Sequence, residues 1–460
     1  MKVNKFTMLK IAFHTLGCRS NYADTIEIKF AVLERGAEIV DFNTPADVYV
    51  LNTCTITKGA DKDAQRILRQ LRKKQPTARI IVVGCLAECG FTQLAESSLV
   101  DAVVQKKDRW QLTDIIFGLR ADTVPTFKVD LLNKPLSTLL KGPGEFVGTT
   151  QMRSRFHLRI QNGCENHCTY CIVPRTRGKF TSRSPERILE DIQFLTNLGY
   201  EEIVLTGTHI GAYGIDLGLN LFELLKKIES SKMPRIRLSS LDPNELSVDL
   251  INLLASSPIL CNYLHVCFQS FSDKILKRMG RQYKLAEVAK MVFKAKSSIK
   301  NICIGSDVIC GFPGESREDV NQAVKLFLDL PISYLHVFPY SERSGTSASK
   351  LDGVVPLVER KARADLWRSY SKQRRGEFLK SLCHEQLEII VEQTREQQLF
   401  GISREYAGVR VDLAEQDLSA LPAIGSRLNV MARTVNNEKE ILLCDFLANQ
   451  HAVFKHVKKT

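Results

Sequence analysis

The sequence predicts an α/β protein with several domains: an N-terminal open parallel α/β sheet, a central partial (β/α)6 barrel and a C-terminal small β-barrel. Three observations support this fold class. Short β-branched runs alternate with helical patterns up to residue 118, a second series of six such runs follows a linker, and short alternating strands fill residues 384–447. The length of 460 residues allows this many domains.

Three cysteines mark the N-terminal sheet, which is predicted over residues 1–118. The runs KIAFHTLGC, DVYVLNTC and RIIVVGC are typical of buried parallel strands, and residues 22–35 and 60–75 between them have helical spacing. Cys18, Cys54 and Cys85 each stand at the carboxyl end of one of these strands. Because ligands of open α/β sheets bind outside the carboxyl ends, we expect the three thiols to meet at one rim.

The central barrel is predicted over residues 151–382, after a linker at 119–150 and including a basic helix at 355–382. Its six strand-like runs are FHLRIQ, EEIVLTG, RIRLSS, YLHVCFQ, NICIGSDVI and SYLHVFP. The active site of such a barrel opens at the carboxyl ends of its strands. The last segment, 384–447, is expected to be a small β-barrel of a kind often used to hold single-stranded RNA.

Composition narrows the class of protein. The net charge of +13 favours a polyanionic partner such as nucleic acid. The first residues lack an apolar signal region, and no window approaches about 18 consecutive apolar residues, so we expect a cytoplasmic protein without a membrane span. Thirteen cysteines in such a chain favour metal binding over disulfides.

The stretch GCENHCTYC carries Cys164, Cys168 and Cys171 directly after the first barrel strand. Zinc would need a fourth ligand, and His167 lies inside the stretch, but residues this crowded do not readily wrap around one ion. The alternative is a cubane cluster, in which three thiolates each take one iron and the fourth iron stays open. A small molecule can chelate that iron and receive an electron.

A cysteine motif of this spacing, with Tyr170 before the last cysteine, resembles that of the radical S-adenosylmethionine (SAM) superfamily. The resemblance covers nearly the whole chain: TLGCRSN, VLNTCTIT, VVGCLAE, IQNGCENHCTYCIVPRTRG, RIRLSSLDP, SDVICGFPGE and HVFPYSERSGT are similar to motifs of methylthiotransferases. The C-terminal barrel resembles the family's RNA-binding TRAM domain. TLGC and LSSLDP are most similar to the MtaB subfamily, whose members attach a methylthio group to carbon 2 of N6-threonylcarbamoyladenosine at position 37 of tRNA.

The resemblance implies a role for each cysteine triad. The 4Fe–4S cluster on Cys164, Cys168 and Cys171 would cleave SAM to a 5′-deoxyadenosyl radical, and a second 4Fe–4S cluster on the N-terminal triad would carry the sulfur, which a second SAM methylates. Such chemistry must be carried by cofactors, since no side-chain base can usefully remove the hydrogen from adenine carbon 2. The implied partners are the tRNA anticodon loop, a low-potential electron donor and a sulfur source, with a monomer as the default state. Candidate SAM-contacting residues are Tyr170, Gly207, Thr208 (or His209), Gln269 and Ser270.

Further residues outside the two triads carry expectations of their own. Arg175 and Arg177 are candidates for holding a substrate phosphate or the cofactor carboxylate. Two positions depart from the family pattern: Phe271 stands where the family usually has glycine, and Glu88 stands where it usually has glutamine. Because a carboxylate beside an anionic cluster is unfavourable, we expect Glu88 to face outward.

Three alternative functions remain open. Two lie within the family: a methylthiotransferase of isopentenylated adenosine in tRNA, and one that modifies an aspartate of a ribosomal protein. The third is of another class, a non-catalytic iron–sulfur protein that binds RNA. The presence of both cysteine triads argues against the third, since simple RNA binding needs no open iron.

Overall fold

The computed structural model describes residues 8–105, 111–118, 136–139, 154–229, 234–413 and 422–447. Most of the predicted linker at 119–150 lies outside these ranges. Its one described piece is the short helix α6 (Leu136–Leu139), whose first backbone N–H donates to Asp191 Oδ1 at 2.9 Å. Among the described helices, none is long and apolar enough to cross a membrane.

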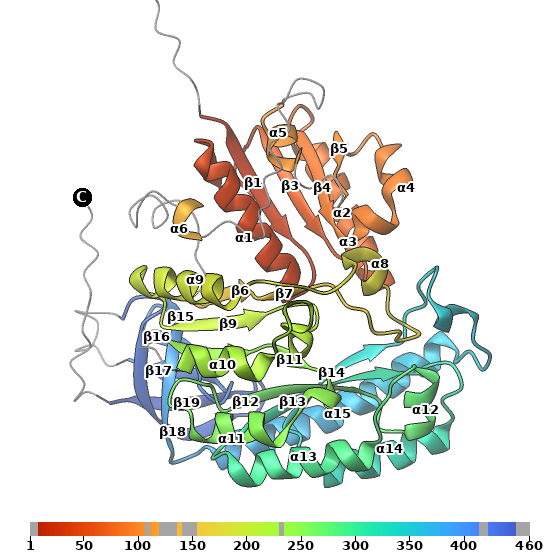
Figure 1. The fold of residues 1–460 in the computed structure, drawn as a ribbon, viewed down its shortest axis with the longest axis vertical. Helices are drawn as coiled ribbons and strands as arrows, with labels where there is room; N and C mark the ends of the chain where they lie inside the picture. The colour runs from red at the N-terminus through yellow and green to blue at the C-terminus, as the bar shows by residue number, and fades with distance from the viewer. Residues whose placement is uncertain are drawn as a thin grey trace, which may run out of the picture.

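The N-terminal unit is the predicted open parallel sheet, at the top of Figure 1 in red and orange. Its five strands lie in the order β2–β1–β3–β4–β5, and every pairing is parallel. The central strand is buried along its whole length because helices cover both faces, as its continuous apolar run predicts. The strands are β1 (Lys10–Thr15), β2 (Glu38–Val40), β3 (Val48–Thr53), β4 (Arg79–Gly84) and β5 (Ala102–Val103). The helices are α1 (Arg19–Glu34), α2 (Lys58–Lys74), α3 (Cys85–Cys89), α4 (Phe91–Ala95) and α5 (Leu112–Ile116).

The central unit contains the six predicted parallel strands, with one of them divided. Its strands pair in two groups, β6–β9–β10 and β11–β12–β13–β14. Only Ser239 separates β10 from β11, so one stretch of chain pairs with β9 first and with β12 afterwards. The result is a partial barrel, as predicted. The strands are β6 (Phe156–Arg159), β9 (Glu202–Thr206), β10 (Arg235–Leu238), β11 (Ser240–Leu241), β12 (Tyr263–Gln269), β13 (Cys303–Cys310) and β14 (Tyr334–Pro339).

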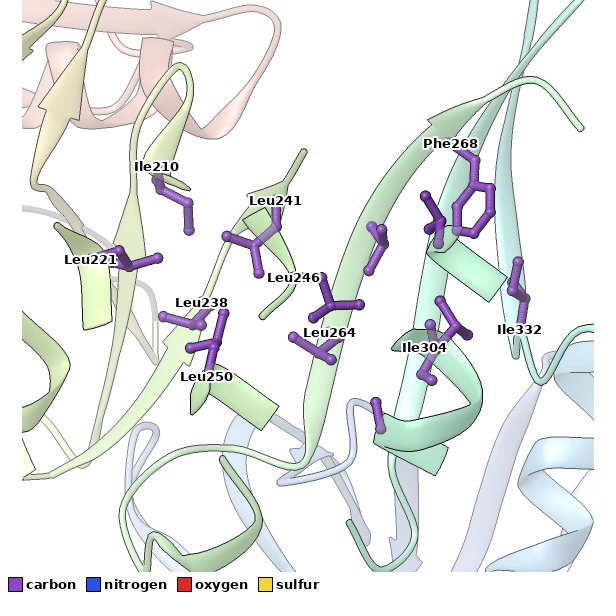
Figure 2. Packing of buried hydrophobic residues seen from close by; sticks show 14 of the residues in the cluster. Ile210, Leu221, Leu238, Leu241, Leu246, Leu250, Leu264, Phe268, Ile304 and Ile332 are labelled. Atoms are coloured by element: carbon purple, nitrogen blue, oxygen red, sulfur yellow. The ribbon is translucent and has the colours of Figure 1, made fainter. Parts of the chain in front are cut away.

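Amphipathic helices cover the outer face of this barrel, and the core lies between helices and strands. Figure 2 shows Leu238, Leu264 and Ile304 from the strands packed with Leu221 and Leu250 from helices. Local capping fixes where several helices begin; for example, the Ser184 side chain accepts from the third residue of its helix. The helices are α9 (Pro185–Asn197), α10 (Leu221–Glu229), α11 (Val248–Ser256), α12 (Asp273–Arg278), α13 (Leu285–Ser298) and α14 (Arg317–Asp329).

Helix α1 of the N-terminal unit packs on the inner face of the barrel. Side chains alternate across a strand, and on β6 Phe156 and Leu158 belong to the helix-facing core. Arg159, on the opposite face, makes buried ion pairs with Asp24 and Glu27 of α1. Buried charges between α1 and β6, the edge strand of the first group, therefore join the two units.

The C-terminal unit is a closed five-stranded barrel, as predicted, with strand order β15–β16–β17–β19–β18. It covers the amino ends of the central strands, since Tyr263, Cys303 and Tyr334 at the starts of β12, β13 and β14 share its core. Figure 1 shows it in blue beside the point where β9 begins. The C-terminal unit thus lies at the end of the barrel opposite the carboxyl ends of the strands. Helix α15 (Leu357–Ser381) packs along β14 of the central unit and leads into this barrel. The strands are β15 (Gln386–Arg395), β16 (Gln398–Ser403), β17 (Gly408–Asp412), β18 (Arg427–Asn436) and β19 (Ile441–Phe446).

Candidate functional site

The first cysteine triad lies at the carboxyl ends of three adjacent strands. Cys18 is the residue before α1, Cys54 follows β3, and Cys85 opens α3 directly after β4. Cys54 and Cys85 are buried while Cys18 is exposed. Gly17 is required between them: its φ is +101°, and a Cβ there would stand 2.9 Å from Cys54 Sγ. Only glycine at position 17 therefore leaves the space beside the sulfur of Cys54 open.

The second triad lies in the loop after β6 and the short strand β7 (Gln161–Asn162). The loop is held by backbone hydrogen bonds from Cys164 N–H to Gly178 O and from Thr169 N–H to Met279 O, both 2.9 Å. Cys168 Sγ accepts from Arg281 Nη1 at 3.3 Å. Burial raises the pKa of the Cys171 thiol to about 12, and a bound cation such as iron would favour its ionised form.

The spacing of both triads fits an iron–sulfur cluster better than a single zinc ion. Thiolates around one tetrahedral zinc stand about 2.3 Å from the metal and hence within about 4 Å of one another. In the described part of the chain, the ligand atoms of His265, Cys267 and Asp307 all lie within 4.8 Å of one another. The three sulfur atoms of each cysteine triad do not lie that close together. His167 is exposed and outside that group as well. Three thiols held further apart suit the corners of a cubane.

His209 lies beside the second triad. Its Nδ1 is 3.7 Å from Cys164 Sγ, and its Nε2 pairs with the carboxylate of Glu245. Burial acts to lower the pKa of His209, but its contacts with Cys164 and Glu245 raise the pKa to about 10. A cationic histidine can therefore partner a thiolate here, as outer-sphere donors commonly do around metal ligands.

Arg177 joins the two triads across the domain boundary. It ends the short helix α8 (Val173–Arg177) that follows Cys171, and only 6% of it is exposed. Its Nη2 donates to Asp24 Oδ2 at 3.1 Å and to Asn21 Oδ1 at 2.5 Å on α1, and its Nη1 donates to Asn162 Oδ1 at 3.0 Å. Burial raises the pKa of Cys85, and the positive charge of Arg177 acts against that rise. Arg177 is thus engaged within the protein, whereas Arg175 is exposed.

Three further hydrogen bonds tie the N-terminal unit to the barrel mouth. Arg343, in the loop after β14, donates to Asp61 Oδ2 at 2.6 Å and to the hydroxyl of Thr55, the residue after Cys54. Ser20 Oγ donates to the carbonyl of Gly207 at 3.0 Å, in the loop after β9. The carboxyl ends of both sheets therefore face one shared region.

The predicted SAM-contacting residues lie around that region with differing contacts. Tyr170 packs edge-on against Phe312, and Thr208 Oγ1 donates to Asn162 Oδ1 at 3.1 Å. Gln269 has a φ of +66°, an uncommon backbone conformation for a residue other than glycine, at the carboxyl end of β12. Ser270 is 3% exposed, and its hydroxyl accepts from the backbone N–H of Ser272. A Cβ at Gly207 would stand 2.8 Å from Gln161 O, so the loop itself requires glycine there.

The two departures from the family pattern have different surroundings. Phe271 is buried in the barrel core, where its ring stacks on Phe268 and on Trp367 at centroid distances of 5.2 and 5.5 Å. Glu88 lines the same small cavity as Cys85 and Arg177, so the expectation that it faces outward is wrong. The nearby positive charge of Arg177 offers a physical reason, because it offsets the repulsion that motivated that expectation.

Sequence reasoning missed a polar group on the inner face of β12, β13 and β14. His265 Nε2 lies 2.9 Å from Asp307 Oδ1, and Cys267 Sγ donates to Asp307 Oδ2 at 3.3 Å. His336 Nδ1 lies 3.2 Å from the same carboxylate. The sequence did contain a signal for this group. His265 and Cys267 in β12 are two residues apart, as are Tyr334 and His336 in β14, so each pair lies on one face of its strand.

Comparison with known proteins gives the class and the family. A Radical SAM superfamily profile matches residues 158–327, and that of uncharacterized protein family UPF0004 matches residues 10–105. Threonylcarbamoyladenosine tRNA methylthiotransferase MtaB of Bacillus subtilis is 36% identical, and the match covers 85% of this chain and 88% of that protein. The protein of the same name from Aquifex aeolicus is 34% identical, and the match covers 84% of this chain and 94% of that protein. The tRNA-2-methylthio-N(6)-dimethylallyladenosine synthase of Aquifex aeolicus is 30% identical over 85% and 90%.

The barrel and its first-strand cysteine motif therefore define a radical SAM enzyme, a class that uses a 4Fe–4S cluster and SAM. The fold alone is shared with the radical SAM methyltransferase TsrM of Kitasatospora setae, at a TM-score of 0.52 and 14% identity over 75% of this chain and 77% of that one. Within the class, the chain belongs to the MtaB family of methylthiotransferases.

Proposed function

We propose that this enzyme attaches a methylthio group to carbon 2 of N6-threonylcarbamoyladenosine at position 37 of tRNA, in the cytoplasm. The single observation that carries the proposal is the contact of Arg177 with both cysteine-bearing units: it follows Cys171 in sequence, and its charge acts on Cys85. A reaction that activates a carbon at one centre and delivers sulfur from another needs such closeness. The named activity of the MtaB relatives supports the substrate.

Each triad holds one 4Fe–4S cluster in this proposal: Cys164, Cys168 and Cys171 the first, and Cys18, Cys54 and Cys85 the second. When bound, the first supplies the electron that cleaves SAM and the second supplies the sulfur. The chain's own contribution is to orient and tune the thiolates. Arg281 donates to Cys168, and His209 partners Cys164.

Residues near the barrel mouth bind SAM, and other surfaces bind RNA. Tyr170, Gly207, Thr208, Gln269 and Ser270 form the SAM site, of which Gln269 is the best supported because strained backbone is common at ligand sites. The C-terminal barrel and the exposed positive charge of α15 hold the anticodon stem–loop. A low-potential electron donor and a sulfur source act on the monomer.

The test uses anaerobically reconstituted enzyme, SAM, a reductant, sulfide and an anticodon stem–loop carrying threonylcarbamoyladenosine. Wild type is expected to form both 5′-deoxyadenosine and methylthiolated product. Cys171→Ala is expected to form neither, whereas Cys54→Ala keeps 5′-deoxyadenosine formation and loses the product. Cys383→Ala, outside both triads, is the matched control and keeps both.

Three outcomes would overturn parts of the proposal. Full methylthiolation by Cys54→Ala removes the role of the N-terminal triad. If the enzyme methylthiolates a stem–loop carrying isopentenyladenosine and not the one carrying threonylcarbamoyladenosine, then isopentenyladenosine is its substrate. Unchanged RNA binding with no turnover under any condition favours a non-catalytic RNA-binding protein.

A further inference from the structure

Arg19 extends from the first cysteine triad into the interior of the barrel. It is the first residue of α1 and the neighbour of Cys18. Its Nη2 donates to the hydroxyl of Tyr406 in the C-terminal barrel at 3.3 Å. Tyr406 is packed against Tyr263, at the start of β12, with ring centroids 4.5 Å apart. One side chain of the N-terminal unit thus reaches the far end of the central barrel.

The tyrosines continue into the polar group on the inner face of the strands. Tyr263 and Tyr334 share a hydrogen bond between their hydroxyls at 2.9 Å, and Tyr334 OH lies 3.2 Å from His265 Nδ1. His265 in turn contacts Asp307. A chain of contacts, polar except where the ring of Tyr406 packs on Tyr263, therefore runs from Arg19 to Asp307. His336 lies at its outer end, with a side chain that is 50% exposed.

In the described part of the chain, no carboxylate compensates the charge of Arg19. Among the residues that the structure describes, none lies within ion-pair distance of the guanidinium of Arg19 or of Arg375, which stacks over Tyr334 at 5.5 Å. By contrast, Arg237, which lies over Tyr406, is paired with Glu202. A guanidinium has five donors, and the phenol oxygens of Tyr406 and Tyr263 are neutral acceptors that satisfy only part of them. A partly enclosed cation without a partner is costly unless an anion of the ligand supplies one.

We propose that Arg19 binds the carboxylate of the threonylcarbamoyl group of the substrate and so selects it over an uncharged N6 substituent. This inference rests on the proposed function. When a nucleotide is extruded into an enzyme, its phosphates stay at the mouth and the Watson–Crick edge enters first. The N6 substituent lies on that edge, one ring atom from carbon 2, so its carboxylate reaches the interior while carbon 2 stays near the cysteine triads. Arginine suits a carboxylate because its donors match it in a bidentate manner.

The experiment measures binding and turnover with two anticodon stem–loops, one carrying threonylcarbamoyladenosine and one carrying its primary amide, which has the same shape without the charge. Reconstituted wild type is expected to bind the carboxylate RNA about 10- to 100-fold more tightly by fluorescence anisotropy, as charge-assisted hydrogen bonds allow. Arg19→Gln is expected to bind both RNAs equally, and Arg19→Lys to recover part of the preference. Arg66→Gln, on the exposed face of α2, keeps the full preference.

Iron content and 5′-deoxyadenosine formation check that Arg19→Gln keeps its clusters, since Cys18 is adjacent. If Arg19→Gln loses iron, the variant Tyr406→Phe is used in its place. Tyr406 belongs to neither triad, and its substitution removes the hydroxyl that orients Arg19. A several-fold smaller preference for the carboxylate RNA is then expected. An undiminished preference in the substituted enzyme overturns the inference. Wild type that methylthiolates both RNAs with equal affinity overturns the inference alone, whereas wild type that methylthiolates neither overturns the proposed function.

Discussion

The guanidinium of Arg177 lies 3.1 Å from the carboxylate of Asp24, and this ion pair connects the radical motif to the helix that follows Cys18. Both side chains are at most 7% exposed. Arg159 and Arg183 from the barrel extend the same contact to Asp24 and Glu27. These buried ion pairs therefore help to fix the relative position of the two triads.

Arg177→Gln is predicted to lower methylthiolation on the order of 100-fold, because a small misplacement of one centre relative to the other has effects of that size. Formation of 5′-deoxyadenosine is expected to continue, since the second triad is intact. Chromatographic quantification of both products checks this, with Arg66→Gln on α2 as the control. Equal loss of both products would show that Arg177 supports the SAM site itself.

The base of the barrel contains a second buried charge group. Glu202 is paired with Arg235 at 2.5 Å and Arg237 at 2.8 Å, and these arginines donate to Ile402 O and Ser403 O of the C-terminal barrel. Burial alone would raise the pKa of Glu202, but Arg237 and Arg235 hold it well below its ordinary value. Glu202→Gln is predicted to lower the free energy of unfolding by about 3–5 kcal/mol at pH 7, because it leaves buried guanidinium charge unpaired.

The sign of the pH dependence follows from the lowered pKa. The unfolded chain protonates this carboxyl near about pH 4.3, whereas the folded chain does not, so its stabilisation is full above that value and is lost as the pH falls. Wild type should therefore lose more stability than Glu202→Gln between pH 6 and pH 3. Urea denaturation at several pH values measures the difference; parallel curves would contradict the assigned ion pairs.

Phe271→Gly restores the residue usual in the family and is predicted to destabilise the protein by about 4 kcal/mol, because it empties a fully packed aromatic site. The KM for SAM should not change, since the ring faces the core. Thermal unfolding and steady-state kinetics check both statements, with Phe293→Ala at a half-exposed position as the control. A lower KM for SAM would show that Phe271 had narrowed the cofactor site.

Binding of tRNA is predicted to weaken with salt, because basic residues release counterions from the RNA. Lys361 and Lys372 are exposed on α15. If each contacts a phosphate, changing both to glutamate should lower the slope of log affinity against log salt by about two. Lys296→Glu on α13 is the control. Affinity that stays flat between low and high salt would contradict an RNA site on this surface.

Sequence reasoning succeeded where a local pattern fixes the outcome. A continuous β-branched run predicts a buried strand, and a cysteine after it must lie at the carboxyl edge, so the positions of Cys18, Cys54 and Cys85 followed directly. The division of the third barrel strand at Ser239 was not visible, because it depends on which neighbours the two halves find.

The partners of charged and aromatic side chains were the part that could not be predicted. Arg177 was a candidate for binding a phosphate, yet it binds Asp24, which is distant in sequence. Glu88 was expected to face outward because Arg177 was not known to lie beside it. Such contacts join separate domains, and no periodicity within one element records them.

The central claim is tested most directly by mass spectrometry of nucleosides from total tRNA, in cells with and without this gene. The account predicts that the methylthiolated form of threonylcarbamoyladenosine disappears while its unthiolated precursor accumulates, and that wild type but not Cys54→Ala restores it. An unchanged level of that nucleoside, with loss of the methylthio group from isopentenyladenosine instead, would contradict the substrate. No change in either nucleoside would contradict the tRNA reaction itself.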